Sequence, residues 1–492
     1  MESTLKRENW KSPLGFLLAA VGSAVGLGNI WRFSYMAYSN GGGAFLIPYF
    51  VALLTAGIPL LLLEFALGHR FRGSAPVAYG AVGRRWEWLG WWVSTLVMFG
   101  IEIYYVVIIS WCLNYFFLSF GLRWGSDPNA FFFKRFLSLS PSPMQLGGVE
   151  PRVLLGLAFV WFLTWFIASR GIQKGIEAAN KVFMPLLFLL TAVLVFWSLR
   201  LSGASAGISA YLRPDFSKLL KPGVWIDAYS QIFFTLSLAQ GIMVAYASYL
   251  PERSNITRDA VAVSLLNCGY SIFAGFAVFA TLGFMATAQG KPIDAVVSQS
   301  IGLAFVAYPK AVALMPAGSL FGAIFFFCLV VAGLSSCVSL MEAFVSAYVD
   351  KFGAERRRVV TVLSVLGFAG GIVFTTRAGL HWINIVDHFI TDYGLVLSGL
   401  FESVMVGWFL GTHFLRSHMN RVSTFRVGGW WDMCVRYLIP LVLFVIFTES
   451  LVGEFLRPYH GYRWLSLVFI GGGWLAVTII LATVFYLRRW KS

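Results

Sequence analysis

The sequence predicts an all-α polytopic membrane protein of about twelve transmembrane helices, built as an inverted repeat of five plus five helices in which helices 1 and 6 are broken. Of its 492 residues, 58% are hydrophobic and 12% are charged, and the mean hydropathy is +0.76. Such values lie outside the range of soluble globular domains. Apolar segments of about 20 residues, long enough to cross a bilayer, recur along the chain. Two of them are interrupted at corresponding positions of the two halves, which predicts the repeat.

The basic residues indicate how the chain is threaded through the membrane. The formal net charge is +15, from 37 Lys and Arg against 22 Asp and Glu. They gather at alternate connections: Lys6, Arg7 and Lys11 before the first span, Arg70, Arg72, Arg84 and Arg85 after the second, and Arg356–Arg358 and Arg488–Lys491 later. This positive-inside pattern argues against a nucleic-acid partner and places the N-terminus in the cytoplasm. We therefore expect a multi-pass protein of the cell membrane, with the lipid bilayer as its surroundings.

The spans and their grouping follow from the apolar segments. We expect spans at 14–37, 43–70, 89–120, 153–170, 178–199, 225–250, 259–288, 318–349, 358–376, 383–410, 433–456 and 464–488. These give a cytoplasmic segment 1–13, a first repeat 14–199, an extracellular connection 200–224, a second repeat 225–410, and two last helices with a cytoplasmic C-terminus, 411–492. Residues 289–316 are mixed in character and fit a short helical cap over an entrance.

The first break lies in Ala20–Phe33, which reads A-V-G-S-A-V-G-L-G-N-I-W-R-F. Gly22, Gly26 and Gly28 each lower helix propensity by about 1 kcal/mol relative to Ala. Within a bilayer an opened backbone is tolerated only where it lines a cavity or holds a ligand. The alternative is that Gly22 and Gly26 form a GxxxG face for helix packing.

The second break lies in the sixth span, I-F-F-T-L-S-L-A-Q-G-I-M-V-A-Y, where Ser237, Gln240 and Gly241 interrupt an apolar helix. Taken alone, Gln240 could be a polar side chain bonded to a neighbour. Two broken helices in matching positions instead indicate a secondary transporter whose site lies near the bilayer midplane.

Several motifs carry a family resemblance. They are R-E-N-W at Arg7–Trp10, G-S-A-V-G-L-G-N-I-W-R-F, N-G-G-G-A-F at Asn40–Phe45, I-Y-Y-V in the third span, Q-I-F-F-T-L-S-L in the sixth and A-G-L-S-S in the eighth. With these motifs the chain resembles the neurotransmitter:sodium symporter family, including its LeuT-like bacterial members, in register from Arg7 to about Gly411. The resemblance implies sodium-coupled import of an amino acid by alternating access.

The resemblance also implies two sodium sites. Sodium is a hard cation that prefers oxygen ligands. The first site would use Ala24, Asn29, Thr235 and Asn267, together with the substrate carboxylate. The second would use Gly22, Val25, Ala332, Ser335 and Ser336. Without the family resemblance, the Ser335 and Ser336 hydroxyls would be expected to donate hydrogen bonds to carbonyls of the preceding helical turn.

The substrate class follows from Gly26. The family's monoamine carriers have an aspartate at this place, whereas amino acid carriers have glycine, so the ligand brings its own carboxylate to the backbone N–H groups, to sodium and to the Tyr105 hydroxyl. The resemblance nominates as substrate-binding residues Ser23, Ala24, Gly26, Gly28, Ile101, Tyr105, Phe234, Ser237, Ala239, Gln240, Ser336 and Leu340. Compared with the family's leucine carrier, Ala239 replaces glycine and Gln240 replaces phenylalanine. We expect a small or polar substrate.

The residue at position 271 indicates whether the protein uses chloride. Chloride-dependent animal members have serine here, whereas the bacterial leucine carrier has a glutamate. Chloride would be bound by Tyr49, Gln231, Thr235, Asn267 and Ser271. It would balance two sodium ions that face one ligand carboxylate in a low-dielectric site. Glu102 in the third span is an alternative source of that charge.

The gates and two buried acids complete the assignment. By resemblance, Arg32 and Asp387 pair across the outer entrance, and Arg7, Trp10, Tyr249 and Asp350 form the inner gate. Glu64 would accept hydrogen bonds from the unwound sixth span. Glu102 could contact a ligand cation, carry a proton or pair with a buried donor, since an acid within the membrane is costly and functional by default.

Two other classes of function stay open. A receptor of the same fold would bind the amino acid without moving it, and a channel would leak ions. Intact ion sites and gates favour transport over both. An enzyme is not expected, because the sequence has no HExxH, no P-loop and no nucleophile beside a base.

Overall fold

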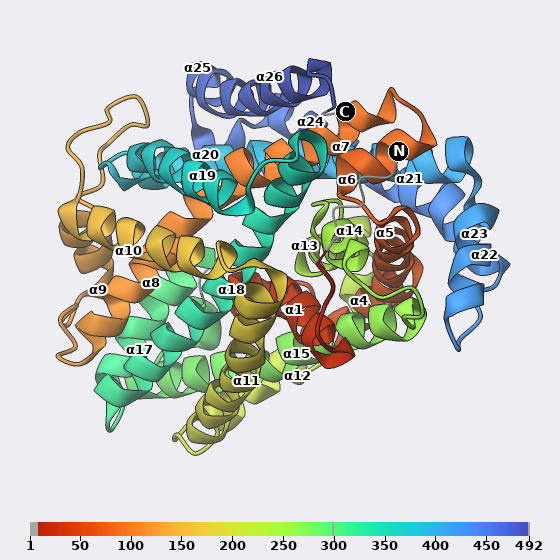
Figure 1. The fold of residues 1–492 in the computed structure, drawn as a ribbon. Helices are drawn as coiled ribbons and strands as arrows, with labels where there is room; N and C mark the ends of the chain where they lie inside the picture. The colour runs from red at the N-terminus through yellow and green to blue at the C-terminus, as the bar shows by residue number, and fades with distance from the viewer. Residues whose placement is uncertain (1–7, 298–299, 491–492) are drawn as a thin grey trace.

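The computed structural model describes residues 8–297 and 300–490, and within them the chain is almost entirely helical (Figure 1). Ten helices in this part are long and apolar enough to cross a membrane, and the bent pair Pro13–Ala24 and Leu27–Ser39 adds an eleventh span. The sixth predicted span is divided into two helices that are each too short to be counted. The prediction of an all-α polytopic fold is therefore confirmed.

The first half of the chain contains the helices of the first five predicted spans. They are α1 (Pro13–Ala24), α2 (Leu27–Ile30), α3 (Arg32–Ser39), η1 (Gly42–Phe45), α4 (Leu46–Ala52), η2 (Leu53–Gly57), α5 (Ile58–Phe71), α6 (Ala75–Val82), α7 (Trp86–Thr95), η3 (Leu96–Glu102), α8 (Ile103–Ser119), α9 (Pro128–Ala130), η4 (Phe131–Phe136), α10 (Pro151–Ala168), η5 (Ile172–Glu177), α11 (Ala178–Ser198), α12 (Ala204–Leu212) and η6 (Phe216–Leu220).

The second half contains the helices of the remaining spans. They are α13 (Pro222–Thr235), α14 (Ile242–Ser248), α15 (Ile256–Gln289), η7 (Ile293–Ala295), α16 (Ser300–Gly302), η8 (Leu303–Ala307), α17 (Tyr308–Leu314), α18 (Gly318–Phe352), α19 (Arg356–Gly371), η9 (Ile372–Thr375), α20 (Gly379–His388), η10 (Phe389–Leu395), α21 (Val396–Val404), η11 (Met405–Gly411), α22 (Thr412–Val422), α23 (Gly429–Met433), η12 (Cys434–Leu438), α24 (Ile439–Leu456), η13 (Tyr459–Gly461), α25 (Trp464–Ser466), η14 (Leu467–Gly472) and α26 (Gly473–Leu487). The helix from Leu303 to Leu314 lies where a short cap was predicted.

The depth of burial separates central from peripheral helices. In α18, 89% of the most apolar stretch is buried, against 22% for the helix that contains α24 and 28% for the one that contains α26. Accordingly, α18 runs through the middle of the bundle and α26 lies along its edge (Figure 1). The site-bearing helix α1 packs against α11, α15 and α18, so it is enclosed on several sides.

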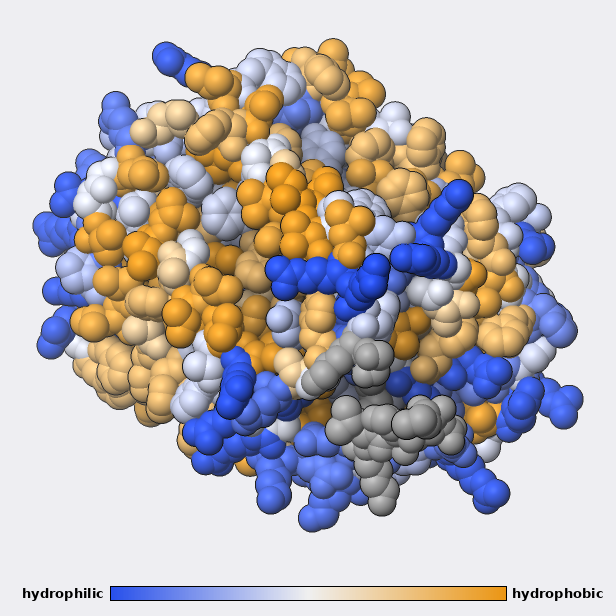
Figure 2. All heavy atoms as spheres, turned by 45° about the horizontal axis from the view of Figure 1, so that its top comes forward, coloured by the Kyte–Doolittle hydropathy of each residue, from blue (hydrophilic) through white to orange (hydrophobic). Residues whose placement is uncertain are grey.

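The outer surface suits a lipid environment. Large apolar side chains are exposed on the outer helices, among them Leu155, Phe196, Phe455 and Leu487. Figure 2 shows broad apolar areas over one face, with hydrophilic side chains gathered toward its rims. A surface this apolar would be unfavourable in water and is favourable against lipid chains.

Candidate functional site

The first break separates α1 from α2. Val25 has ψ 98° and Gly26 has φ −122° and ψ −165°, so both residues are extended. The chain consequently bends by 68° between the two helical parts. The Ser23 carbonyl, freed at this break, accepts hydrogen bonds from the hydroxyls of Ser237, at 3.1 Å, and Ser336, at 3.5 Å. The glycine-rich stretch therefore opens the helix where the sequence predicted.

The second break separates α13 from α14. Ser237, Ala239 and Gly241 have φ values of 53°, 56° and 67°. The left-handed conformation costs a residue with a side chain about 1–2 kcal/mol. Glu64 offsets part of this cost, since its Oε1 accepts the Ala239 N–H at 2.6 Å, and the Ser398 hydroxyl donates to the Ala239 carbonyl at 3.1 Å. Glu64 thus lies where it was expected, beside the unwound segment.

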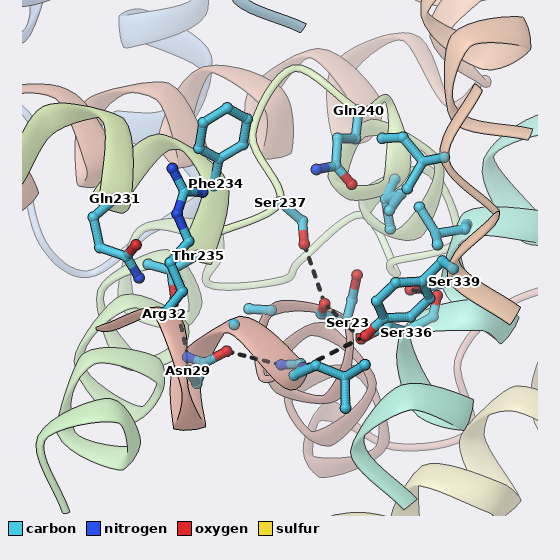
Figure 3. A pocket seen from close by; sticks show the side chains of 18 residues that line it. Ser23, Asn29, Arg32, Gln231, Phe234, Thr235, Ser237, Gln240, Ser336 and Ser339 are labelled. Carbon is cyan, nitrogen blue, oxygen red and sulfur yellow. Dashed lines mark hydrogen bonds between the residues drawn. The ribbon is translucent and has the colours of Figure 1, made fainter. Parts of the chain in front are cut away.

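A cavity of about 150 Å³ lies between the two breaks (Figure 3). It is lined by Ser23, Ala24, Gly26, Leu27, Gly28, Asn29, Arg32, Ile101, Tyr105, Gln231, Phe234, Thr235, Ser237, Gln240, Ile242, Ser336, Ser339 and Leu340. All the residues nominated for substrate binding are among them except Ala239. The Ala239 methyl group instead faces α21, where a Cβ on Gly399 would lie 3.2 Å from it. The nominated residues are thus brought together with that one exception.

Gly26 and Gly28 shape one end of the cavity. A Cβ on Gly26 would lie 3.2 Å from both the Tyr105 and the Ser336 hydroxyl oxygens, so a larger side chain there would displace these groups. A Cβ on Gly28 would meet nothing within 4 Å. The Leu27 N–H donates to the Tyr105 hydroxyl over 3.5 Å, a long hydrogen bond. This end therefore offers a hydroxyl and a backbone N–H group, with space in front of them.

The residues expected at the first sodium site are in mutual contact. The Gly26 N–H donates to Asn29 Oδ1 at 2.8 Å, which turns Asn29 Nδ2 toward Asn267 Oδ1, also at 2.8 Å. In this arrangement Asn267 Oδ1 lies 3.1 Å from the Ala24 carbonyl oxygen and 3.2 Å from that of Thr235. If the Asn267 amide is turned over, its nitrogen donates to both carbonyls but then faces the Asn29 nitrogen. In either orientation the Ala24 and Thr235 carbonyl oxygens approach the Asn267 amide, and carbonyl and amide oxygens are ligands that a hard cation prefers.

In the second sodium set, Gly22 of α1 lies against Ser335 of α18. A Cβ on Gly22 would lie 2.3 Å from Asn180 Oδ1 and 2.4 Å from the Ser335 hydroxyl oxygen, so only glycine allows this approach. The Ser335 hydroxyl donates to Asn180 Oδ1 at 2.6 Å, whereas Ser336 bonds back to the Ala332 carbonyl at 3.3 Å. Back-bonding therefore describes Ser336 but not Ser335. Gly22 therefore lies in close contact with Asn180 and Ser335, near the first helix break.

Three members of the chloride set, Thr235, Asn267 and Ser271, lie beside the Asn29 amide nitrogen. The Ser271 hydroxyl oxygen lies 2.8 Å from Asn29 Nδ2 and donates to the Asn267 carbonyl at 3.2 Å. Tyr49 is fully buried and faces Cys268 and Ser271, but its hydroxyl has no hydrogen bond of normal geometry in the described chain. A buried donor without a partner is rare, and an anion would supply its acceptor.

The outer gate residues are close to the cavity but do not form an ion pair with each other in the described chain. The Arg32 guanidinium carbon lies 4.6 Å from the centre of the Phe234 ring, a cation–π contact. Asp387 accepts the Tyr104 hydroxyl at 2.5 Å. The outer side is therefore not closed by Arg32 and Asp387.

Of the residues predicted to form the inner gate, Trp10 holds the N-terminal segment against α14. Trp10 donates its backbone N–H to the Tyr249 carbonyl at 3.1 Å and its indole N–H to the Tyr246 carbonyl at 2.8 Å. Asp350 accepts the Ser74 N–H at 2.8 Å. The predicted partner Arg7 lies outside the described residues. Trp10 thus joins the N-terminal segment to α14.

Glu102 is buried in the π-helical segment η3, and neither carboxyl oxygen has a hydrogen-bond partner in the described residues. It interacts electrostatically with Cys337 of α18. π-Helical segments often mark functional positions. The neighbouring Ile101 faces the cavity, whereas Glu102 is not among the lining residues.

Sequence reasoning missed several residues of this region. Asn180 contacts the second sodium set, and Ser339 lines the cavity. Glu342 accepts the Tyr249 hydroxyl at 2.8 Å and pairs with Arg356, so it joins the inner gate. Glu342 stands in the apolar eighth span, and its charge was the one signal that could have found it.

The chain matches the sequence profile of the Sodium:neurotransmitter symporter family over residues 7–130 and 123–491. It is 46% identical to an uncharacterized sodium-dependent transporter of Methanocaldococcus jannaschii, over 100% of this chain and 99% of that protein. Among human proteins it is 34% identical to the sodium- and chloride-dependent GABA transporter 2 and to the sodium- and chloride-dependent neutral and basic amino acid transporter B(0+). Each match covers 92% of this chain and 81% of the human protein.

Proposed function

The chain belongs to the sodium:neurotransmitter symporter family, a family of sodium-dependent transporters, and we propose that it imports an amino acid or a related small zwitterion that carries a carboxylate. The observation that carries this proposal is the cavity between the two helix breaks, where free backbone groups, hydroxyls and amides meet. Backbone left open at membrane depth is explained by binding at this place.

The substrate carboxylate would lie at the end of the cavity beside Gly26. This end has no acidic side chain among its lining residues, and it presents the Tyr105 hydroxyl and the Leu27 N–H. A carboxylate there would also lie near Ala24 and Asn267, which belong to the set proposed for the first sodium. Sodium would then connect the substrate to the protein, so that each favours binding of the other.

The far end of the cavity would receive the substrate side chain. Gln240 lines it and makes no hydrogen bond within the described residues, and Phe234, Ile101 and Leu340 supply apolar surface. A free amide favours a polar group on the substrate, because leaving it unpaired on binding costs energy. We therefore propose a small or polar amino acid.

Sodium would occupy two places. The first would lie among Ala24, Asn29, Thr235 and Asn267, and the carbonyl oxygens of Ala24 and Thr235 near the Asn267 amide support it. The second would be formed by the carbonyls freed at the first break with those of the eighth span; its members are Gly22, Val25, Ala332, Ser335 and Ser336. Since these residues belong to α1 and α18, sodium there would hold the two helices together.

Chloride would assist by balancing charge. Two sodium ions and one substrate carboxylate leave one positive charge in a low-dielectric site. The buried Tyr49 hydroxyl and the Ser271 hydroxyl support an anion beside Asn267; Gln231 and Thr235 complete the proposed set. Glu102 would be either a structural acid or a proton site, since it lies apart from the cavity.

Transport would proceed by alternating access, with the first repeat at 14–199, the second at 225–410 and the N-terminus in the cytoplasm. The hydrogen bonds of Trp10 to the Tyr246 and Tyr249 carbonyls support a closed inner gate. The separate contacts of Arg32 with Phe234 and of Asp387 with Tyr104 support an open outer gate. Exposed ion pairs contribute only about 0–1 kcal/mol, so such gates can form and break during each cycle.

Uptake into proteoliposomes under an imposed inward sodium gradient tests this proposal. We expect accumulation of the substrate above its external concentration, abolished when sodium is equal on both sides. A substrate screen by thermal shift, with and without sodium, identifies the amino acid first. Binding that never leads to accumulation would show a receptor of this fold, and sodium currents without substrate would show a channel.

A further inference from the structure

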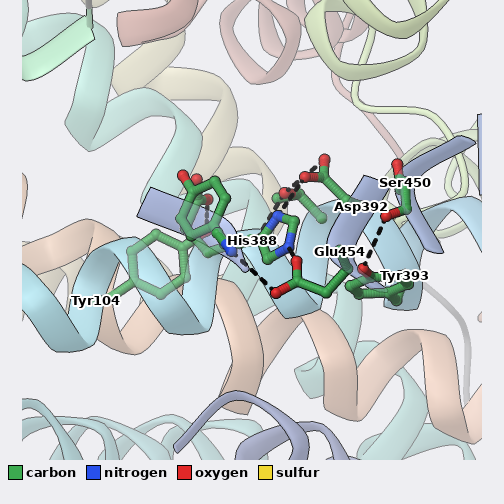
Figure 4. Close-up of polar contacts among 9 residues, drawn as sticks. Tyr104, His388, Asp392, Tyr393, Ser450 and Glu454 are labelled. Carbon is green, nitrogen blue, oxygen red and sulfur yellow. Dashed lines mark hydrogen bonds and ion pairs between the residues drawn. The ribbon is translucent and has the colours of Figure 1, made fainter. Parts of the chain in front are cut away.

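His388 ends α20 next to the outer gate residue Asp387, and both of its ring nitrogens contact carboxylates (Figure 4). Nδ1 lies 2.7 Å from Asp392 Oδ2, one turn further along the chain. Nε2 lies 2.6 Å from Glu454 Oε2 in α24. His388 and Glu454 are buried, and Asp392 is 34% exposed. The three side chains therefore join the tenth span to the eleventh.

The hydrogen bonds require a charged imidazole. Ionised carboxylates only accept hydrogen bonds, so two ring nitrogens that face them must both donate, and only the imidazolium does so. The proton belongs to the ring because a carboxylic acid is the stronger acid. Glu454 Oε1 also accepts the Tyr459 N–H at 3.1 Å, so both oxygens of this carboxyl group have a hydrogen-bond partner.

The Tyr459 ring stabilises the same state. It stacks on the His388 ring with 4.0 Å between centres and 3° between planes. A cation within about 6 Å of an aromatic face is attracted to it. Three elements, η10, α24 and η13, thus hold one protonated side chain.

The surroundings add negative charge and little positive charge. The other titratable groups that face the cluster are Asp387 of α20, Tyr104 of α8, Tyr393 of η10 and Arg32 of α3. The segments η9 and η14, which also pack against α20, have no titratable side chain, and Glu102 of η3 interacts with Cys337 instead. Arg32 lies over Phe234, so His388 is the cation that directly contacts both carboxylates.

We propose that His388, Asp392 and Glu454 form a proton-dependent latch that fastens the gate-bearing end of α20 to α24. While His388 is protonated, Asp387 stays with Tyr104 and apart from Arg32. Loss of the proton leaves one carboxylate facing a ring lone pair, so α20 is released from α24 and Asp387 becomes free to pair with Arg32. The inference rests on the proposed outer gate.

The latch is present at low pH and is lost as pH rises. The contacts of His388 with Asp392 and Glu454 exist only in the folded protein, and they favour the protonated imidazole ring. We expect the unfolding temperature of the purified full chain to fall as the pH rises past the point at which His388 loses its proton, and the fall to be absent in His388→Gln. Sodium-driven uptake by the wild type should change over the same pH range, with a flat profile in His388→Gln.

Two further variants test whether the pH dependence comes from the cluster itself. Glu454→Gln removes one anionic acceptor and should move the midpoint of the wild-type pH profile to lower pH. His381→Gln is the matched control, because His381 lies on the same helix with its nitrogens 2.8 Å from the Tyr462 hydroxyl and 2.9 Å from the Ser140 carbonyl, both neutral. It should keep the wild-type profile.

The outcomes separate the latch from the proposed function. Wild-type uptake with the same pH profile in His388→Gln would overturn the latch and leave transport standing. A profile that His381→Gln flattens equally would also overturn it, since a general loosening of α20 would then suffice. Absence of any wild-type uptake would instead count against the proposed function, and the unfolding measurements would still decide the latch.

Discussion

The Asn29 amide nitrogen lies 2.8 Å from the Ser271 hydroxyl oxygen, so a residue of the proposed first sodium site touches one of the proposed chloride site. The same nitrogen lies 2.9 Å from the Thr235 hydroxyl and 2.8 Å from Asn267 Oδ1. An amide nitrogen has two hydrogens, so three oxygens compete for them. A charge placed at residue 271 would therefore act directly on the sodium site.

Replacing Ser271 with Glu should make transport independent of chloride. A fixed carboxylate beside Asn29 would supply the negative charge that chloride otherwise brings. Uptake by the wild type should fall about tenfold when chloride is exchanged for a large organic anion, whereas Ser271→Glu should change by less than about twofold. Ser271→Ala is the control and should stay sensitive to the exchange. Wild-type uptake that ignores chloride would contradict the anion site.

Replacing Gln240 with Phe should move substrate preference toward larger apolar amino acids. The Gln240 amide faces the cavity and lacks a partner in the described chain, so the ring adds apolar surface where hydrogen bonding was offered. We expect the ratio of uptake rates for an apolar over a polar amino acid to rise by about tenfold. Competition of unlabelled amino acids against labelled substrate measures it. An unchanged order of competitors would remove Gln240 from substrate contact.

The two helix breaks could be predicted because their signal is local. Glycines in Ala20–Phe33 and polar residues around Gln240 interrupt otherwise apolar helices, and the structure bends or unwinds at both places. The long apolar helices could be read from composition in the same way, although twelve spans were expected and the described residues contain ten, or eleven with the bent pair. The direction of a single side chain could not, as the methyl group of Ala239 shows, because it depends on the left-handed turn around it.

Contacts between distant segments left no readable signal. Asn180 is an ordinary polar residue in the fifth span until the fold places it against Gly22 and Ser335. His388 and Glu454 lie 66 residues apart, and neither suggests the other. Such pairs become visible only when the helices that carry them are packed together.

Replacing Asn180 with Ala should weaken sodium binding at the second proposed site. Asn180 Oδ1 accepts the Ser335 hydroxyl at 2.6 Å, so its removal frees this side chain to turn away from Gly22. A lost buried hydrogen bond costs about 1–3 kcal/mol. The sodium concentration for half-maximal uptake should rise at least about fivefold, with substrate affinity restored at high sodium.

Asn114→Ala serves as the control for Asn180→Ala. Asn114 lies in α8 and donates to the Ser110 and Arg152 carbonyls, away from both proposed sodium sites. It should leave the sodium dependence unchanged. If Asn180→Ala also leaves it unchanged, Asn180 has no part in holding Ser335 for sodium.

Replacing Ala239 with Gly should stabilise the protein without altering its substrate preference. Ala239 has φ 56°, a conformation that glycine adopts without the steric cost of a side chain, and its methyl group faces Gly399 rather than the cavity. We expect the free energy of unfolding to rise by up to about 1 kcal/mol, seen as a higher unfolding temperature in detergent.

Ser237→Gly is the matched variant, since Ser237 has φ 53° but lines the cavity and donates a hydrogen bond to the Ser23 carbonyl. Ser237→Gly should remove a similar steric cost from the backbone, but it should lower the affinity for the substrate. A changed competition profile in Ala239→Gly would place the methyl group in the path of the substrate after all.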